Sequence, residues 1–331
     1  MLNARDLVKE FRVARREPGL AGALRGLLRP RETTLRAVDG VSLALSGSEI
    51  VGLLGPNGAG KSTTLKMLTG VLDPTSGRVD FEGRSPRADR RWFTRRIGAV
   101  FGQRTQLWWE LPLRDSLAAA KALYEIPDAT FARTRAALVA ELEIGSFLHV
   151  PVRQLSLGQK MRAELCAAML HRPRLLFLDE PTLGLDLEAR AAFHRVLRTA
   201  SRGWGTGVLL TTHDVADIDA LCERIVVICG GRVAYSGSVG AAKASHARRT
   251  RLVCTVRRSA DTPPPRTAPP GIEMVREGVR VVLTIDRARA TREDALAWLG
   301  AGCEILAEAP GEVSTGDLLL DLYGAARAVA A

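Results

Sequence analysis

The chain has 331 residues, of which 46% are hydrophobic, and it carries a formal net charge of +11 at pH 7. This length fits one large domain with a smaller second one; no apolar run is long enough to span a membrane, and the first residues lack the apolar core of a signal peptide. The excess of arginine indicates an anionic partner such as a membrane surface or nucleic acid. Basic residues are densest at 12–36 and 84–104, and a solvated arginine-rich face is the first expectation for each of these stretches.

The beginning of the chain is expected to form strands and turns around one insertion. Residues 1–13 predict a strand and turn, and residues 38–45 and 78–82 predict alternating strands. Residues 15–36 form a basic insertion with leucines at helical spacing. This insertion packs on the domain or lies on membrane headgroups, and packing is the preferred interpretation.

Short apolar runs predict a parallel sheet that is buried on both faces. The runs cover residues 50–54, 97–101, 175–178, 208–210 and 225–228. Between the second and third runs, residues 113–170 predict a helical region. This region is interrupted at Pro127, Gly145 and Pro151, so several helices are expected.

Residues 55–62 match the phosphate-binding pattern G-x-x-x-x-G-K-[ST], between the predicted strand 50–54 and a predicted helix at 63–69. Glycines allow successive backbone N–H groups to turn toward one anion, and the helix adds its positive end. Lys61 would reach the β- and γ-phosphates, and the hydroxyl of Ser62 is the expected Mg²⁺ ligand. The alternative is a glycine-rich turn with a chance Lys and Ser. The expected nucleotide-binding residues here are Gly55, Pro56, Asn57, Gly58, Ala59, Gly60, Lys61, Ser62 and Thr63.

Polar residues follow the ends of several predicted strands. Gly55, Gln103, Asp179, Glu180 and His213 each come shortly after an apolar run. Ligands of open α/β sheets bind outside the carboxyl ends of the strands. We therefore expect these residues to converge on the edge that carries the phosphate-binding loop.

The run at 175–178 ends in two acidic residues. Asp179 would hold Mg²⁺ directly or through water, and Glu180 could polarise the attacking water as a general base. The alternative is a strand that ends in an acidic turn before Pro181.

Residues 155–159, Leu-Ser-Leu-Gly-Gln, open a predicted helix that runs to Leu170. Ser156 and Gln159 fit the S-x-x-Q capping box. The same geometry leaves a hydroxyl and free N–H groups at a helix N-terminus, where a terminal phosphate could bind.

The order of six motifs over about residues 1–236 resembles that of the nucleotide-binding subunit of an ABC (ATP-binding cassette) transporter. The motifs are the Walker A motif at 55–62, the Q-loop at Gln103, the signature at 155–159, the Walker B motif at 175–179 with Glu180, the D-loop at 184–186 and the H-loop at His213. The resemblance implies an α/β fold with a P-loop NTPase (RecA-like) core, an antiparallel β subdomain and a helical subdomain at about 104–170. It also implies a nucleotide-binding domain over 1–240 and a small accessory α+β domain over 241–331.

The resemblance further implies that two such domains meet head to tail with ATP and Mg²⁺ between them. Ser156 and Gly158 would contact the γ-phosphate held by the partner chain, His213 would bridge to that phosphate, and Gln103 would sense Mg²⁺. The expected catalytic residues are Glu180, His213 and Gln103, the expected metal ligands are Ser62, Gln103 and Asp179, and the further nucleotide contacts are Phe11, Ser156, Gly158, Gln159 and Asp186.

Two departures from the family pattern stand out. Leu157 replaces the first glycine of the usual L-S-G-G-Q signature, so a working motif with a changed packing neighbour is expected. Phe11 corresponds best to the aromatic residue that stacks on adenine, although a long insertion follows it.

Residues 103–112 resemble those of the ATPases of ABC-2 type export systems. The resemblance implies a separate ABC-2 type integral membrane permease as partner, a second cassette in a homodimer, and a cytoplasmic position at the inner face of the cell membrane. Trp108 and Trp109 would lie beside the groove for the permease, although paired aromatics are more often core residues.

The residues also bear on two other classes of function. A soluble ABC ATPase that acts on nucleic acid or ribosomes would suit the net charge of +11, but the exporter interpretation expects no stable nucleic-acid partner. Intact Lys61, Asp179, Glu180 and His213 argue against a structural cassette that does not hydrolyse ATP.

The last part of the chain, from about residue 241, predicts the small α+β domain. Strands are expected at 252–256 and 279–285, on either side of the proline-rich residues 262–270. A helix capped by Thr291 and Asp294 is expected at 291–299, and a last helix at 316–323. The five cysteines, which include no C-x-x-C pair, predict buried thiols in a reducing compartment such as the cytosol.

Overall fold

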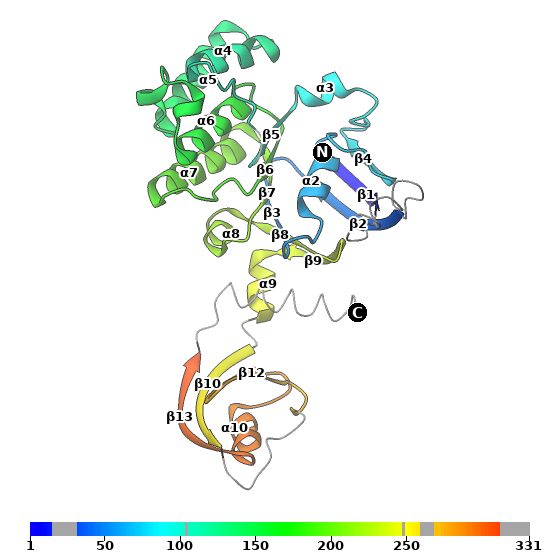
Figure 1. Cartoon of the computed structure of the whole chain (residues 1–331), viewed down its shortest axis with the longest axis vertical. Coiled ribbons are helices and arrows are strands. Elements are labelled where there is room, and N and C mark those ends of the chain that lie inside the picture. The colour runs from blue at the N-terminus through cyan, green and yellow to red at the C-terminus, as the bar shows by residue number, and fades with distance from the viewer. Residues whose placement is uncertain (15–31, 103–104, 247–248, 259–267, 312–331) are drawn as a thin grey trace, which may run out of the picture. The chain divides into compact units, whose positions relative to one another are not determined.

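The computed structural model describes residues 1–14, 32–102, 105–246, 249–258 and 268–311 (Figure 1). The chain divides into two compact units, with the boundary between Gly237 and Ser238. The Q-loop residue Gln103, most of the basic insertion and the helix expected at 316–323 lie outside the described residues.

The first unit is built on a six-stranded sheet with the order β5-β6-β7-β3-β8-β9. Its strands are β3 (Ile50–Leu54), β5 (Ile97–Phe101), β6 (Leu175–Asp179), β7 (Gly207–Thr211), β8 (Arg224–Cys229) and β9 (Arg232–Ser238). The pairs β5–β6, β6–β7, β7–β3 and β3–β8 are parallel, which confirms the prediction for all five apolar runs. Strand β9 was not predicted, because its residues are mostly polar and lie partly or fully exposed.

Helices cover both faces of this sheet in the first unit (Figure 1). They are α2 (Lys61–Leu68), α3 (Arg90–Thr94), α4 (Leu113–Leu123), α5 (Asp128–Glu141), α6 (Leu157–Met169), α7 (Leu187–Trp204) and α8 (Val215–Leu221). Figure 1 shows α4 to α7 on one side of the sheet and α2 on the other. Among the described residues no helix is long and apolar enough to cross a membrane.

The strands are apolar on both faces because successive side chains enter two different cores. In β6, Leu176 and Leu178 pack with the helices α4 to α7, whereas Leu175 and Phe177 pack with α2 and the antiparallel strands. Period-two alternation of side chains produces this division. All four side chains are essentially inaccessible to solvent.

The helical region is interrupted where the sequence predicted. Pro127 is the N-cap of α5, and Pro151 is the N-cap of a short 3₁₀ turn at Val152–Gln154. Gly145 begins another 3₁₀ turn, Gly145–Phe147. Proline lacks the backbone N–H that a helix interior needs, so each proline marks the start of a new helical segment.

A second, antiparallel sheet of the first unit has the order β2-β1-β4. It comprises β1 (Leu2–Ala14), β2 (Glu32–Leu45) and β4 (Ser76–Phe81). The predicted limits of the insertion and of the second strand were wrong, because residues 32–36 pair with the outer half of β1. The β-branched Thr33 and Thr34 favour this extension, and Arg36 pairs with Glu10 across the strands at 2.8 Å.

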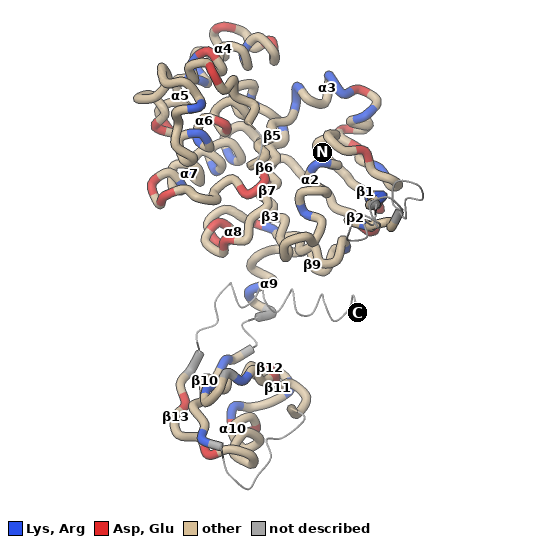
Figure 2. The backbone as a smooth tube through the Cα atoms, in the orientation of Figure 1, with Lys and Arg blue, Asp and Glu red and all other residues tan. Residues whose placement is uncertain are grey.

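Figure 2 shows basic residues along α3. The side chain of Arg91 is 80% exposed, and both Arg91 and Arg95 form ion pairs with Glu125. The guanidinium groups of Arg84 and Arg96 lie over Trp92, at 4.6 and 4.3 Å from a ring centroid. The exposed side chains of Arg87 and Arg91, at 81% and 80%, fit the solvated face expected here, whereas Arg95 and Arg96 are partly buried.

The second unit contains a four-stranded sheet with the order β11-β12-β10-β13 and its own apolar core. Its elements are α9 (Val239–His246), β10 (Arg249–Arg258), β11 (Ile272–Glu277), β12 (Arg280–Asp286), α10 (Arg292–Gly300) and β13 (Cys303–Gly311). The predicted cap of α10 by Thr291 and Asp294 is confirmed as a complete capping box. The sequence did not predict β11, β13 or α9.

All five cysteines are free thiols. Four are buried as predicted, while Cys222 is only partly so. Burial raises the pKa of the Cys166 thiol to about 12, which keeps it protonated at neutral pH.

Candidate functional site

The glycines of the phosphate-binding loop allow a close backbone approach. Gly55 and Gly60 have φ angles of 149° and 104°, in the region that side chains rarely adopt. A Cβ atom at Gly55 would lie 2.1 Å from the carbonyl oxygen of Ile228, and one at Gly60 would lie 2.5 Å from that of Ala37. The loop therefore packs directly on the backbones of β8 and β2.

Lys61 is the first residue of α2, two residues before the predicted helix start. Its Nζ atom donates hydrogen bonds to the carbonyl oxygens of Gly55 at 2.7 Å and Pro56 at 3.1 Å. Burial lowers the pKa of Lys61, and the nearby carboxylates of Glu180 and Asp179 partly oppose that shift. The ammonium group and the first N–H groups of α2 suit binding of a phosphate.

The remaining predicted residues of this loop differ in exposure. Asn57, Gly58 and Ser62 are exposed, Pro56 and Thr63 are partly buried, and the methyl group of Ala59 is buried. Ala59 donates its N–H to the carbonyl oxygen of Pro56 over 3.2 Å, which closes the turn. The loop is therefore anchored at Ala59 and Lys61 and open to solvent at its tip.

The Walker A and Walker B motifs meet at Asp179. The hydroxyl of Ser62 donates to Asp179 Oδ1 over 3.2 Å, and the hydroxyl of Thr211 donates to the same oxygen over 2.7 Å. A hydroxyl beside a carboxylate is the type of oxygen set that Mg²⁺ accepts from a protein when phosphates and water supply its other ligands. These residues therefore fit a magnesium site at the predicted edge of the sheet.

Glu180 has an unusual backbone for a non-glycine residue, with φ 49°. Its N–H donates to both the carbonyl oxygen and the hydroxyl of Thr211, at 3.2 and 2.9 Å. These bonds hold a conformation that is unfavourable by about 1–2 kcal/mol. Glu180 Oε1 lies 3.6 Å from His213 Nδ1, so the predicted base and the H-loop residue are neighbours.

Ser156 and Gln159 form the predicted capping box of α6. Ser156 Oγ accepts the N–H of Gln159 over 3.2 Å, and Gln159 Oε1 accepts the N–H of Ser156 over 2.9 Å. Ser156 is exposed, and Gly158 and Gln159 are partly exposed, so the helix N-terminus faces solvent.

Leu157, which stands where the usual signature has a glycine, lies against the D-loop. A Cβ atom at Gly184 in the D-loop would lie 2.7 Å from Leu157 Cδ2. Leu157 is nevertheless 55% exposed. Together with Ser62, Asp179 and Glu180 it lines a pocket of about 680 Å³, which therefore joins the Walker motifs to the signature helix.

Two predicted residues, Asp186 and Phe11, contact other parts of the first unit. Asp186 caps α7 by accepting the N–H of Ala189 over 2.7 Å. Phe11 is 36% exposed near the outer end of β1, paired with Leu35, and it does not line the pocket with Asp179. Gln103 lies outside the described residues, so its predicted roles stay predictions.

The tryptophan pair is not part of the core. Trp108 is 59% exposed and Trp109 is 50% exposed. The core interpretation preferred from the sequence was therefore wrong. The ammonium group of Lys160 lies 5.0 Å from a ring centroid of Trp109.

Sequence comparison identifies a family for the central part of the chain. Residues 38–183 match the family model described as ABC transporter. The chain is 37% identical over 210 residues to the daunorubicin resistance ATP-binding protein DrrA3 of Streptomyces coeruleorubidus, covering 63% of this chain and 66% of that protein. It is 38% identical over 206 residues to the human ATP-binding cassette sub-family A member 9, where the match covers 61% of this chain and only 12% of the much longer relative.

Comparison of structures gives the same assignment for the fold. The chain is similar to a dimeric ATP-binding cassette solved in a post-hydrolysis state with ADP and Pi, with a TM-score of 0.60 and 22% identity. The match covers 72% of this chain and 99% of the solved one. The family match at residues 38–183 includes the phosphate-binding loop, both acidic residues and the signature helix. The chain therefore belongs to the ATP-binding cassette family, and its first unit is an ABC-type P-loop ATPase domain.

Proposed function

We propose that the chain is the ATP-binding and ATP-hydrolysing subunit of an ABC transporter, which drives a separate ABC-2 type permease in export. The observation that carries the proposal is the convergence of Ser62, Asp179 and Glu180 on one pocket beside the phosphate-binding loop. This is the minimum set for binding a nucleotide with its metal and activating a water.

Each residue has a role that follows from its position. Lys61 and the loop N–H groups bind the phosphates, and Ser62 and Asp179 would hold Mg²⁺, which when bound neutralises phosphate charge. Glu180 accepts a proton from the attacking water. His213, 3.6 Å from Glu180, contacts the γ-phosphate and orients the carboxylate.

A second copy of the chain completes the nucleotide site in this proposal. The solved neighbour is dimeric, and the signature helix of this chain has an exposed N-terminus. Apolar side chains near it are exposed as well, with Leu157 at 55%, Leu183 at 56% and Leu187 at 85%. A second cassette would cover these side chains and place Ser156 and Gly158 against its nucleotide.

The permease partner is inferred from relatives and from exposed aromatics. The relative DrrA3 is named for resistance to daunorubicin, which supports export. Trp108 and Trp109 offer an exposed aromatic contact surface for a permease. The chain would then work in the cytoplasm at the inner face of the cell membrane.

The ATPase part of the proposal is tested with Glu180→Gln in the full chain. The variant should bind ATP with near-normal affinity and accumulate as an ATP-bound dimer, while kcat falls at least about 100-fold because the water has lost its base. Glu143→Gln changes an exposed glutamate of the helical region and should keep normal turnover. Normal turnover in Glu180→Gln would show that Glu180 is not the base.

The partner is tested by purifying the tagged chain from detergent-solubilised membranes of its own cells. A polytopic membrane protein should accompany the wild type and be lost from the Trp108→Ala/Trp109→Ala variant, whose ATPase activity should persist. Recovery with RNA or DNA and without a membrane protein would contradict the transporter proposal.

A further inference from the structure

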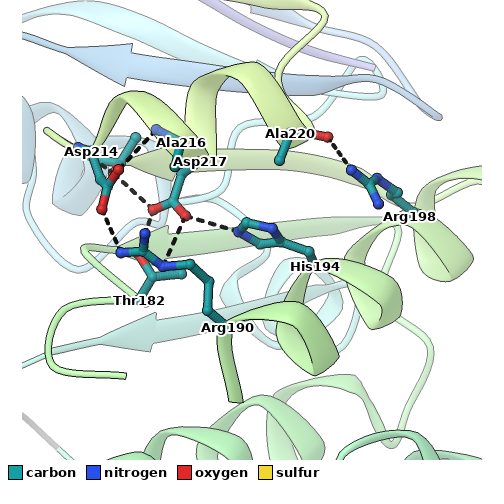
Figure 3. Close-up of polar contacts among 9 residues, drawn as sticks. Thr182, Arg190, His194, Arg198, Asp214, Ala216, Asp217 and Ala220 are labelled. Atoms are coloured by element: carbon teal, nitrogen blue, oxygen red, sulfur yellow. Dashed lines mark hydrogen bonds and ion pairs between the residues drawn. The ribbon is translucent and has the colours of Figure 1, made fainter. Parts of the chain in front are cut away.

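A buried carboxylate lies between the two loops that carry Glu180 and His213. Asp217, in α8, is fully inaccessible to solvent, and Figure 3 shows the side chains that surround it. An ionised carboxylate is unfavourable in such a place unless it is paired and hydrogen-bonded. The function proposed above gives Asp217 no role.

One oxygen of Asp217 accepts a hydrogen bond from a threonine of each loop. Thr182, two residues after Glu180, donates its hydroxyl to Oδ2. Thr212, the residue before His213, donates its hydroxyl to the same oxygen over 3.0 Å. Both threonines are buried. The loop after β6 and the loop after β7 are therefore joined at a single atom.

The other oxygen of Asp217 faces α7 (Figure 3). His194 Nε2 lies 2.8 Å from Oδ1, and Arg190 Nε lies 3.7 Å from the same atom. Burial raises the pKa of Asp217, but the hydrogen bonds from His194 and the two threonines and the charge of Arg190 outweigh it and leave the pKa below its ordinary value. The carboxylate is therefore charged and partnered on both oxygens.

Helix α7 extends this connection to the D-loop. Its N-cap is Asp186, the last D-loop residue, and one turn later Arg190 forms ion pairs with both Asp217 and Asp214. Asp214 directly follows His213 and caps α8. The D-loop, α7 and the H-loop are thus connected through charged groups, of which Asp217 is buried and Arg190 and Asp214 are partly buried.

We propose that Asp217 is a positioning residue that couples the D-loop at 184–186 to residues 212–214, so that displacement of the D-loop moves His213 relative to Glu180. This inference rests on the proposed function, in which a second copy contacts the D-loop. Arrival of that copy would then be transmitted to His213 through the shared carboxylate. Hydrolysis would depend on the partner even though Asp217 touches neither nucleotide nor water.

The first experiment uses Thr182→Val and Thr212→Val, which keep the side-chain shape and remove one hydroxyl each. The matched control is Thr206→Val, because Thr206 is equally buried and donates to the carbonyl oxygen of Pro173 over 2.8 Å, just before β7 begins. Each loop variant should lower kcat about tenfold with KM for ATP within about twofold, since a small misplacement slows the reaction without weakening binding.

The double variant and the serine variants separate positioning from simple destabilisation. The kcat of the double variant should be little lower than that of either single variant, because both changes break the same connection through Asp217 Oδ2. Thr182→Ser and Thr212→Ser should restore kcat. Losses that multiply to about a hundredfold, or equal losses in Thr206→Val, would overturn the proposal.

A second measurement does not require hydrolysis. In hydrogen exchange on the full chain without nucleotide, Thr182→Val should accelerate exchange of the amides at 212–216, and Thr212→Val that of the amides at 181–187. Acceleration confined to the mutated loop would overturn the inference. A wild type without ATPase activity would instead contradict the proposed function, and the exchange result would still decide the coupling.

Discussion

The hydroxyl of Ser62 lies 3.2 Å from Oδ1 of Asp179, although 117 positions separate the two residues in the chain. The parallel order of β3, β7 and β6 creates this proximity, because it brings the carboxyl ends of these strands to one edge. The contact connects the loop that would bind phosphate to Asp179, the residue that would bind Mg²⁺.

Removing the Ser62 hydroxyl should weaken Mg²⁺ binding more than it weakens ATP binding. Ser62→Ala removes one of the two oxygen ligands, so the Mg²⁺ concentration for half-maximal ATPase activity should rise about tenfold. Binding of ATP without Mg²⁺ should change little, because Lys61 and the loop N–H groups remain. Ser62→Thr keeps the hydroxyl and should restore the normal requirement. An unchanged Mg²⁺ requirement in Ser62→Ala would remove Ser62 from the metal site.

Replacing Gly55 or Gly203 by alanine should have opposite effects on the stability of the first unit. Gly55→Ala places a methyl group 2.1 Å from a backbone oxygen at a φ of 149°, so the free energy of unfolding should fall by about 2 kcal/mol or more. Gly203 lies in α7 with open space around it, and Gly203→Ala should raise stability by about 0.5–1 kcal/mol. Urea unfolding of both variants measures the difference. Equal midpoints would contradict the close approach at Gly55.

The two capping boxes provide a matched comparison of stability and activity. Ser156→Ala and Thr291→Ala each remove a hydroxyl that caps a helix, so each should lower the stability of its own unit by about 1 kcal/mol. Only Ser156→Ala should reduce ATPase activity, because Ser156 is the residue expected at the γ-phosphate. Steady-state turnover and calorimetric melting check both statements. Equal turnover in the two variants would leave Ser156 with a purely structural role.

His171 should make the first unit less stable in acid. Burial lowers the pKa of His171 to about 4, although its Nε2–H donates to the carbonyl oxygen of Ile97 over 2.9 Å. The ring also stacks on Tyr124 at 3.9 Å, and its Nδ1 is buried without a partner. Between about pH 6.5 and pH 4 the unfolded chain binds a proton that the folded chain does not, so stability falls as pH falls, by at most about 3 kcal/mol.

His171→Gln keeps a donor for Ile97 and removes the titration. Its unfolding free energy should therefore fall less than that of the wild type between pH 6.5 and pH 4. Carboxylates contribute equally to both proteins, so the difference between the two pH profiles isolates His171. Parallel profiles would show that His171 titrates normally.

The parallel sheet and the site edge could be predicted because their signals are local. Each central strand is a short apolar run, and Gly55, Asp179, Glu180 and His213 each follow such a run within three residues. Thr211 follows Leu210 in the same way and could have been found by the same rule. It was missed because a threonine at a strand end carries no motif, although it binds both Asp179 and the N–H of Glu180.

The remaining features depend on contacts distant in sequence. Four of the five residues at 32–36 are polar, and pairing with β1 makes the stretch a strand. The mixed residues of β11 and β9 likewise give no clear alternation. Asp217 looks like an exposed residue of an acidic helix, and only the fold brings Thr182, Thr212 and His194 around it.

Strand β6 sends alternate side chains into two different cores. The helix-side core that contains Leu176 and the opposite core that contains Phe177 share one backbone, so neither can melt while the other keeps its packing. The first unit should consequently unfold in a single cooperative transition. Leu176→Ala and Phe177→Ala, on opposite faces, should lower the same melting temperature. Strand β6, which positions Asp179 and Glu180 at the site, therefore also couples the unfolding of the helix-side core to that of the opposite core.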